Sequence, residues 1–182
     1  RWPAEKVKVL IQMLDKRLNT SITSSCGRLF DAVSSLAGLR DAVAYEGQAA
    51  IELEQAMGAD AGCYRGEVRK EQGMFVMDPL PMMVEIVADI RKKRDAGVIS
   101  ARFHRGIVSL LADAATVARD ESGIDRIALS GGVFQNAYLS EHLETELVTR
   151  GFKVFVHQEV PPNDACISLG QAYVAAHHLL SR

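Results

Sequence analysis

The sequence predicts an α/β domain, and three observations support this prediction. Residues 125–157 have the pattern of a strand, a helix and a second strand, which is the βαβ unit of a parallel sheet. Two turn-rich segments, 130–136 (SGGVFQN) and 160–170 (VPPNDACISLG), follow the two strands. Most of the preceding chain has helical apolar spacing. Ligands of such sheets bind beyond the carboxyl ends of the strands, where both segments lie.

Helical spacing recurs through the first third of the chain. The first stretch opens with Pro3, which suits the first turn of a helix, and has one apolar stripe. The second should turn Phe30, Val33 and Leu36 inward. The third is expected to end at Gly58, because glycine readily adopts the left-handed conformation that closes a helix. The three predicted helices are residues 2–19, 27–39 and 45–58.

The middle of the chain is predicted to hold a hairpin and two more helices. Residues 63–78 contain two glycines between short apolar pieces, which favours a small β hairpin. A helix then begins at Pro79, or two residues later, runs to Arg94 and is closed by Gly97. A long helix over 100–119 follows. Its predicted inward residues are Phe103, Ile107, Leu110, Leu111, Ala114, Val117 and Ala118.

The last third should alternate between strands and helices in one domain. No internal repeat, low-complexity segment or long polar linker interrupts the chain. The predicted elements are strand 125–130, helix 136–149, strand 152–157 and a helix over about 165–179.

Composition excludes several classes of function. The 182 residues have a formal net charge of −2, with acids and bases interspersed, so we expect no nucleic-acid partner. We see neither a long apolar run nor a charged-then-apolar start, and we therefore expect a cytoplasmic protein without a membrane partner. The three cysteines form no CxxC pair, which argues against a zinc ribbon. GxSxG, Walker A and GxGxxG motifs are absent, which argues against the α/β-hydrolase, P-loop and Rossmann classes.

The double glycine, Gly131 and Gly132, is the first candidate for ligand binding. It lets the backbone turn sharply and lets a ligand approach without a Cβ in the way. The helix behind it is expected to present free N–H groups to a phosphate or nucleotide. A tight turn alone would equally explain the glycines. Asn136 suits a helix N-cap, although its amide can also contact a base or ribose.

Several carboxylates have both a structural and a functional interpretation. Asn163 and Asp164 follow two prolines, and Asp164 stands where a helix begins, so it could cap that helix or instead bind a metal. Asp31 is either a solvated helix residue or a ligand for the vicinal hydroxyls of a ribose. Glu46 complements a helix dipole, and Gly47 permits a close ligand approach.

The five histidines are scattered, without the HExxH spacing of a zinc site. His104 could point into the cleft or lie in the core. His177 and His178 suit an exposed helix end. Cys166 stands where a small residue is expected and has no feature of a nucleophile.

Five sequence blocks, taken in order, form a recognisable set, although no single block is specific. They are 24–39 (SSCGRLFDAVSSLAGL), 45–54 (YEGQAAIELE), 101–115 (ARFHRGIVSLLADAA), 129–139 (LSGGVFQNAYL) and 157–172 (HQEVPPNDACISLGQA). Together they resemble the HypF carbamoyltransferases of nickel–iron hydrogenase maturation. They also resemble, more loosely, tRNA threonylcarbamoyltransferases and antibiotic O-carbamoyltransferases.

The resemblance implies the second lobe of a two-lobed actin/sugar-kinase-like fold (ASKHA, ribonuclease-H-like), with extra N-terminal helices. Residues 1–23 would be a connecting helix and 24–182 the nucleotide-binding lobe of a carbamoyltransferase domain. The family's histidine-rich metal motif belongs to the first lobe and is absent. We therefore expect a fragment that is inactive alone, binds nucleotide weakly and can self-associate through exposed apolar surface.

The resemblance also implies a reaction. Carbamoyl phosphate and ATP would form carbamoyl adenylate, and the carbamoyl group would pass to the C-terminal cysteine of a HypE-type protein to supply a cyanide ligand. The alternatives are a tRNA-modifying enzyme and a non-catalytic nucleotide-binding or docking lobe. The implied nucleotide ligands are Asp31, Glu46, Gly47, Gly131, Gly132 and Asn136, and the implied ligand of a divalent metal (Fe, Zn or Mg) is Asp164.

Overall fold

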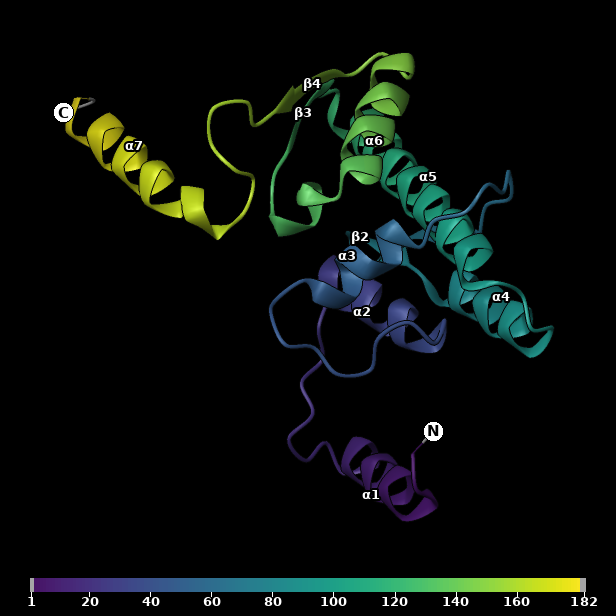
Figure 1. The fold of residues 1–182 in the computed structure, drawn as a ribbon. Coiled ribbons are helices and arrows are strands. Elements are labelled where there is room, and N and C mark those ends of the chain that lie inside the picture. Colours follow the sequence, from purple (N-terminus) through teal and green to yellow (C-terminus); the bar gives the residue numbers. More distant parts are fainter. Residues whose placement is uncertain (1, 181–182) are drawn as a thin grey trace.

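A computed structural model describes residues 2–180, and its elements are arranged around one long helix, α5 (Ala96–Ser122). Figure 1 shows α6 (Ala137–Thr149) lying against α5 beside a small sheet, with the shorter helices around the other end of α5. One hydrophobic core runs through both regions. The first and last predicted domain residues, 1 and 182, lie outside the described residues.

The shorter helices of the core are α2 (Cys26–Leu36), α3 (Gln48–Gln55) and α4 (Leu80–Arg91). Phe30 and Val33 of α2 are completely buried, as predicted, whereas Leu36 is exposed and the prediction for it was wrong. Leu36 is the last residue of α2, and its side chain is turned outward while the next residue, Ala37, packs against the core.

Two predicted helix ends were wrong. The third helix ends at Gln55, with Ala56 in a right-handed conformation, so Gly58 does not close it. Gly58 instead donates its N–H to the carbonyl of Gly97, at 3.0 Å. The fourth helix, α4, ends at Arg91 rather than Arg94.

Gly97 does not close α4 either, because it lies in the first turn of α5. The side chain of Asp95 accepts a hydrogen bond from the N–H of Gly97, at 2.8 Å, and so caps α5. Aspartate is a strong N-cap residue, and this signal was missed. A Cβ on Gly97 would approach the Ala56 carbonyl oxygen to 2.7 Å, which explains the glycine.

The inward face of α5 was predicted correctly over its first four turns. Phe103, Ile107 and Leu110 are buried. Val117 and Ala118 are exposed, contrary to the prediction, because the last turns of α5 lie beyond the short helices that cover its start.

The hairpin was predicted correctly. Strands β1 (Glu67–Glu71) and β2 (Met74–Asp78) pair antiparallel. The turn residues, Gln72 and Gly73, have φ angles of 50° and 82°, as a tight two-residue hairpin turn requires.

The βαβ unit was also predicted correctly. Strands β3 (Arg126–Leu129) and β4 (Lys153–Val156) pair in parallel, and α6 connects them. Short 3₁₀ turns follow each strand: η1 (Gly132–Gln135) follows β3 and η2 (Asp164–Cys166) follows β4. The final helix, α7 (Ile167–Leu180), begins directly after η2.

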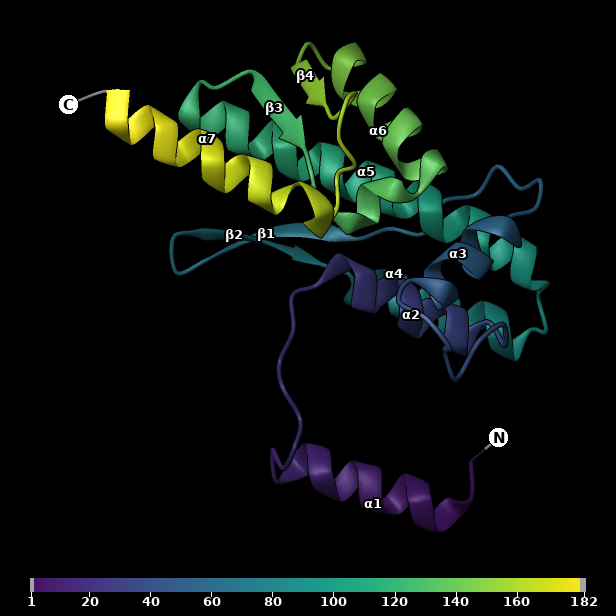
Figure 2. The ribbon, with the colours of Figure 1, turned by 60° about the vertical axis from the view of Figure 1, so that its left-hand side comes forward.

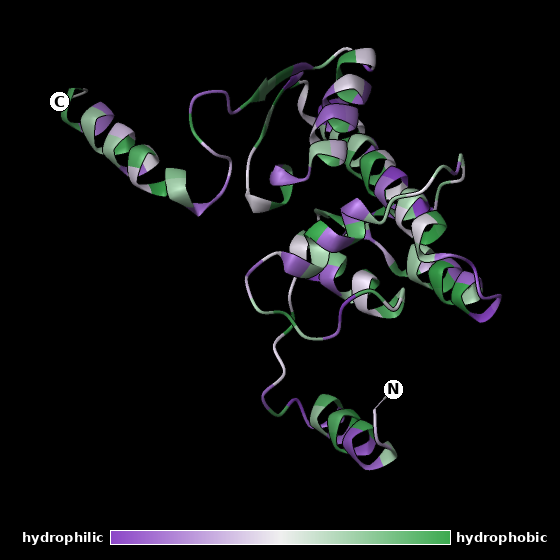
Figure 3. Cartoon of the chain, viewed as in Figure 1, coloured by the Kyte–Doolittle hydropathy of each residue, from purple (hydrophilic) through white to green (hydrophobic). Residues whose placement is uncertain are grey.

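Helices α1 (Ala4–Asp15) and α7 stand away from the rest of the described chain (Figures 1 and 2). Neither has a buried residue among those described. Both carry strongly apolar positions in Figure 3. Within residues 2–180, no helix is long and apolar enough to cross a membrane. The predicted N-terminal stripe is exposed, and its residues are Val7, Leu10, Ile11, Leu14 and Leu18.

The loop before the hairpin packs closely on α5. Arg102 of α5 forms ion pairs with Asp60, at 2.8 Å, and with Asp89, at 3.0 Å. The hydroxyl of Tyr64 donates to Asp89, at 2.9 Å. These bonds hold the loop backbone in contact with Gly106 of α5. A Cβ on Gly106 would overlap the carbonyl oxygen of Tyr64.

We predict that Gly106→Ala destabilises the protein although alanine favours helices. The added methyl group must displace the Tyr64 backbone, and overpacking of this kind costs about 1–3 kcal/mol. Gly170→Ala is the matched control, since its Cβ would meet no atom within 4 Å. It should be neutral or stabilising by up to about 1 kcal/mol. Urea unfolding followed by circular dichroism measures both; equal effects would contradict the prediction.

Candidate functional site

The predicted site residues come together around one cleft of about 640 Å³. Its walls are the start of α2, the start of α3, and the two turns η1 and η2. Gly131 is the one predicted residue that does not line it. The predicted residues that do are Asp31, Glu46, Gly47, Gly132, Asn136 and Asp164.

The two turns that follow the strands meet directly. Gly131 donates its backbone N–H to the carbonyl of Pro162, at 2.8 Å. Gly131 has φ 111° and ψ 155°, a conformation that is open almost only to glycine. The turn therefore requires a glycine at position 131, as one of the two sequence interpretations held for the pair.

The cleft is acidic. Its lining includes the carboxylates of Asp31, Glu46, Glu54 and Asp164 but only one guanidinium, Arg28. That guanidinium is already paired with Asp31, at 2.9 Å. An anionic ligand would therefore meet an unfavourable potential here unless a cation accompanied it.

The start of α3 is shaped by Gly47, which has φ 79° and immediately precedes the helix. No Cβ on Gly47 would meet another atom within 4 Å. The glycine is thus required by the backbone conformation, and it leaves the cleft side of this turn open. Glu46, beside it, is exposed.

Asn136 is the N-cap of α6, and both ends of its side chain are bonded within the protein. Its Oδ1 accepts from the N–H of Leu139, at 2.8 Å. Its Nδ2 lies 3.0 Å from Nε2 of His104. The capping interpretation therefore describes its geometry.

His104 does not point into the cleft but is completely buried. Its Nδ1 lies 2.8 Å from the carbonyl oxygen of Ser100. Burial lowers the pKa of His104 from its ordinary value of 6.5. The ring is therefore neutral at physiological pH, with its proton on Nδ1 and a lone pair on Nε2.

The N-terminus of α6 is less available to a ligand than predicted. Glu54 accepts a hydrogen bond from the N–H of Tyr138, at 3.1 Å. The N–H of Leu139 is taken by Asn136. The expectation of free N–H groups at this helix was therefore wrong for these two. Glu54 itself was missed by the sequence analysis, because a glutamate inside a helical stretch gives no sign of a partner 84 residues away.

The turn η2 is capped by Asn163, whose Oδ1 accepts from the N–H of Ala165, at 3.1 Å. Asp164 is thereby left exposed, and no described residue forms a hydrogen bond or ion pair with its carboxylate. The capping interpretation of Asp164 was therefore wrong, because Asn163 caps the turn, and Asp164 remains available to a ligand.

The metal-ligating side chains and the thiol of the cleft limit its chemistry. Among residues 2–180, no three His, Cys, Asp or Glu side chains lie close enough to hold a metal ion. The described residues alone do not form a metal site, and Asp164 could contribute at most one ligand. Cys26 lines the cleft, but burial raises the pKa of its thiol to about 11. It is therefore protonated and a poor nucleophile at neutral pH.

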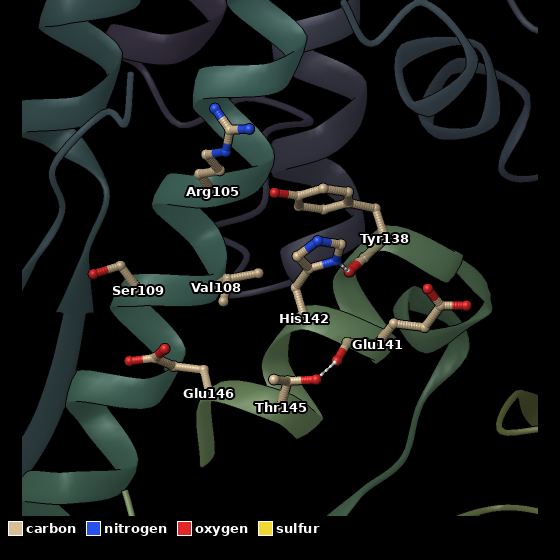
Figure 4. Close-up of a pocket in the computed structure, with 8 residues that line it drawn as sticks. All are labelled: Arg105, Val108, Ser109, Tyr138, Glu141, His142, Thr145 and Glu146. Carbon is tan, nitrogen blue, oxygen red and sulfur yellow. Dashed lines mark hydrogen bonds between the residues drawn. The ribbon is translucent and has the colours of Figure 1, made fainter. Parts of the chain in front are cut away.

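A second cavity, of about 560 Å³, lies between α5 and α6 and contains none of the predicted residues. Figure 4 shows Tyr138 and His142 at one side, with Arg105 and Ser109 of α5 opposite them. The rings of Tyr138 and His142 are stacked, with centroids 3.7 Å apart.

Residues 2–171 match the family model described as Carbamoyltransferase, Kae1-like Domain, second subdomain. The chain belongs to this HypF carbamoyltransferase family. It is 36% identical over 163 residues to carbamoyltransferase HypF of Synechocystis sp., which covers 88% of this chain and 20% of that protein. It is 32% identical to a HypF homologue of Cupriavidus necator, covering 94% of this chain and 45% of that protein.

Solved HypF structures have the same fold. A crystal structure of full-length HypF in the phosphate- and nucleotide-bound form superimposes with a TM-score of 0.92 and 41% identity, over 97% of this chain and 23% of that one. HypF of T. kodakarensis gives 0.85, with 25% identity over 100% of this chain and 23% of that one. The predicted fold class, a second lobe of an ASKHA-like fold, is confirmed. The chain spans about a fifth to a quarter of these HypF proteins.

We predict that Gly131→Ala destabilises the protein by about 1–3 kcal/mol, because alanine must adopt a strained backbone conformation or break the bond to Pro162. Gly132→Ala is the matched control. Its Cβ would lie 3.9 Å from the nearest atom, in Asn163, and its φ is not positive. It should change stability by less than about 0.5 kcal/mol. Equal melting temperatures for the two variants would contradict the prediction.

Proposed function

We propose that this chain forms one side of the nucleotide site of a carbamoyltransferase. The enzyme would use carbamoyl phosphate and ATP through carbamoyl adenylate. It would carbamoylate the C-terminal cysteine of a HypE-type protein and so supply a cyanide ligand for hydrogenase maturation. The observation that carries the proposal is the meeting of the two post-strand turns on one cleft, in a chain of the HypF family.

Each cleft residue has a role in this proposal. Asp31 would accept hydrogen bonds from the ribose hydroxyls, for which its Oδ1 is available because the ion pair with Arg28 is formed by Oδ2. Glu46 and Gly47 would line the ribose and base region, and Gly132 would lie next to the phosphates. Asn136 would act by shape rather than by hydrogen bonding, because its amide is already engaged.

The transfer itself needs no nucleophile from this chain. The acceptor thiolate would attack the carbamoyl carbon and form a C–S bond. The bond from that carbon to the adenylate phosphate oxygen would break, and AMP would leave with the electron pair. The protein's part is to orient the adenylate and to exclude water, which can contribute much of the rate enhancement.

The acidic cleft predicts that a divalent cation accompanies the phosphates, since carboxylates and phosphates otherwise repel. Asp164 is an exposed carboxylate that could approach it. The other ligands would come from outside the described residues, and we expect the chain alone to have no transfer activity.

Two other functions are less well supported. The chain is 25% identical to tRNA N6-adenosine threonylcarbamoyltransferase of Dictyoglomus turgidum, over 92% of this chain and 49% of that protein. The net charge of −2 gives no electrostatic attraction to tRNA, and a gel shift at physiological salt would test it. A non-catalytic docking lobe is the third candidate.

We predict that ADP, added together with Mg²⁺, binds the chain weakly at the first cleft. In a titration of ¹⁵N-labelled protein, the amide signals of Gly47, Gly131 and Gly132 should shift and saturate. Signals from the α5–α6 cavity, such as Ser109 and Thr145, should stay unchanged. Changes confined to the second cavity, or none at all, would contradict the proposed site.

We predict that Asp164→Asn reduces carbamoyl transfer at least roughly tenfold in a longer protein that contains this chain and is active, because an amide binds a phosphate-bound cation less tightly than a carboxylate. Asp120→Asn is the control, since Asp120 is an exposed residue of α5 outside the cleft. Carbamoylation of the acceptor protein is followed by mass spectrometry. Unchanged modification with Asp164→Asn would favour the docking alternative.

A further inference from the structure

A chain of buried polar groups connects two walls of the cleft through the core. Ser100 of α5 donates its hydroxyl hydrogen to the carbonyl of Leu53 in α3. One turn later, Nδ1 of His104 donates to the carbonyl of Ser100, at 2.8 Å. Nε2 of His104 then accepts from Nδ2 of Asn136, at 3.0 Å. The chain of bonds therefore runs from α3, through α5, to the N-cap of α6.

The chemistry of each atom fixes the direction of these bonds. A carbonyl oxygen can only accept, so Nδ1 of His104 must be protonated in the neutral ring. Its Nε2 is then an acceptor, and it can pair with the amide nitrogen of Asn136. Because Oδ1 of Asn136 accepts from Leu139, the amide cannot flip without losing both bonds.

The surroundings of His104 make these bonds necessary. The side chain is completely buried, and the rings of Phe30, Phe103 and Tyr138 meet it edge to face at centroid distances of 5.3, 5.9 and 5.7 Å. A polar ring in such a place is unfavourable unless its nitrogens are bonded. Asn136 would likewise leave a buried N–H without a partner if His104 were apolar.

We infer that His104 is a positioning residue that fixes the separation between the α3 and α6 walls of the nucleotide cleft, acting through Asn136. The inference rests on the proposed function, because it presupposes that the cleft binds a nucleotide. His104 does not line the cleft itself. It adds a residue outside the cleft on which nucleotide affinity depends.

Protonation should release this connection. A proton on Nε2 would face the amide hydrogens of Asn136, so the bond between α5 and α6 would be lost. The charged group that acts on His104 is Glu54 of α3, while Tyr138 of α6 is the other titratable side chain that faces the ring. The pKa of His104 is lower folded than unfolded, so the folded state loses stability as pH falls below about 6.5. The cleft changes its shape only at the lower pH at which His104 is protonated in the folded protein.

The test is the ADP titration of the chain by ¹⁵N spectra at about pH 7.5 and at the lowest pH at which the wild type and His104→Gln remain folded, because His104 is protonated in the folded protein only below its ordinary pKa. His104→Gln keeps an acceptor for Asn136 but does not titrate, and His104→Phe removes the acceptor. We expect His104→Gln to bind ADP like the wild type at the higher pH, and His104→Phe roughly tenfold more weakly.

The pH dependence separates positioning from a general structural role. Between the two pH values, the dissociation constant of the wild type should rise roughly tenfold more than that of His104→Gln, which corrects for titration of ADP itself. If His104→Phe does not fold, this comparison alone decides. An equal pH dependence of wild type and His104→Gln overturns the inference and leaves the nucleotide site intact. Failure of the wild type to bind ADP at either pH overturns the proposed function, and the inference with it.

Discussion

Packing of α6 onto α5 is the interaction on which the rest of the structure depends. A two-stranded sheet is marginal on its own, and a parallel one normally needs cover from helices. Here Leu139, Leu143 and Leu147 of α6 share one core with residues of α5 and with Leu129 of β3. This packing holds the ends of both strands in place, and the two turns at the cleft begin at those ends.

The same packing explains why the cleft is built from distant parts of the chain. Glu54 bonds the start of α6 to α3, and the buried bonds of Ser100 and His104 join α3 to Asn136. These contacts use polar groups that a ligand would otherwise meet. The glycine turns, Gly47 and Gly132, are the parts of the cleft that remain open at the backbone, while most of its charged side chains are acidic.

Local signals were sufficient for much of the fold. The alternation of strands and helices over 125–157 predicted the βαβ unit, because apolar periodicity and turn residues are local properties of the chain. The same signals placed the two turns at one edge of the sheet, and the structure joins them through Gly131 and Pro162. Helix ends were predicted less well, as at Gly58 and Gly97, because each glycine serves a close approach between segments rather than a cap.

The sequence alone thus determined the family, the α/β class and the segments that form the cleft, since these depend on periodicity and on motifs within short stretches. The tertiary structure decided which polar groups are free. Asn163 caps η2 and leaves Asp164 exposed. Glu54 accepts from the N–H of Tyr138, and His104 pairs with the amide nitrogen of Asn136. Hydrogen-bond partners that lie 32 and 84 residues apart are brought together only by packing, and no local pattern encodes them.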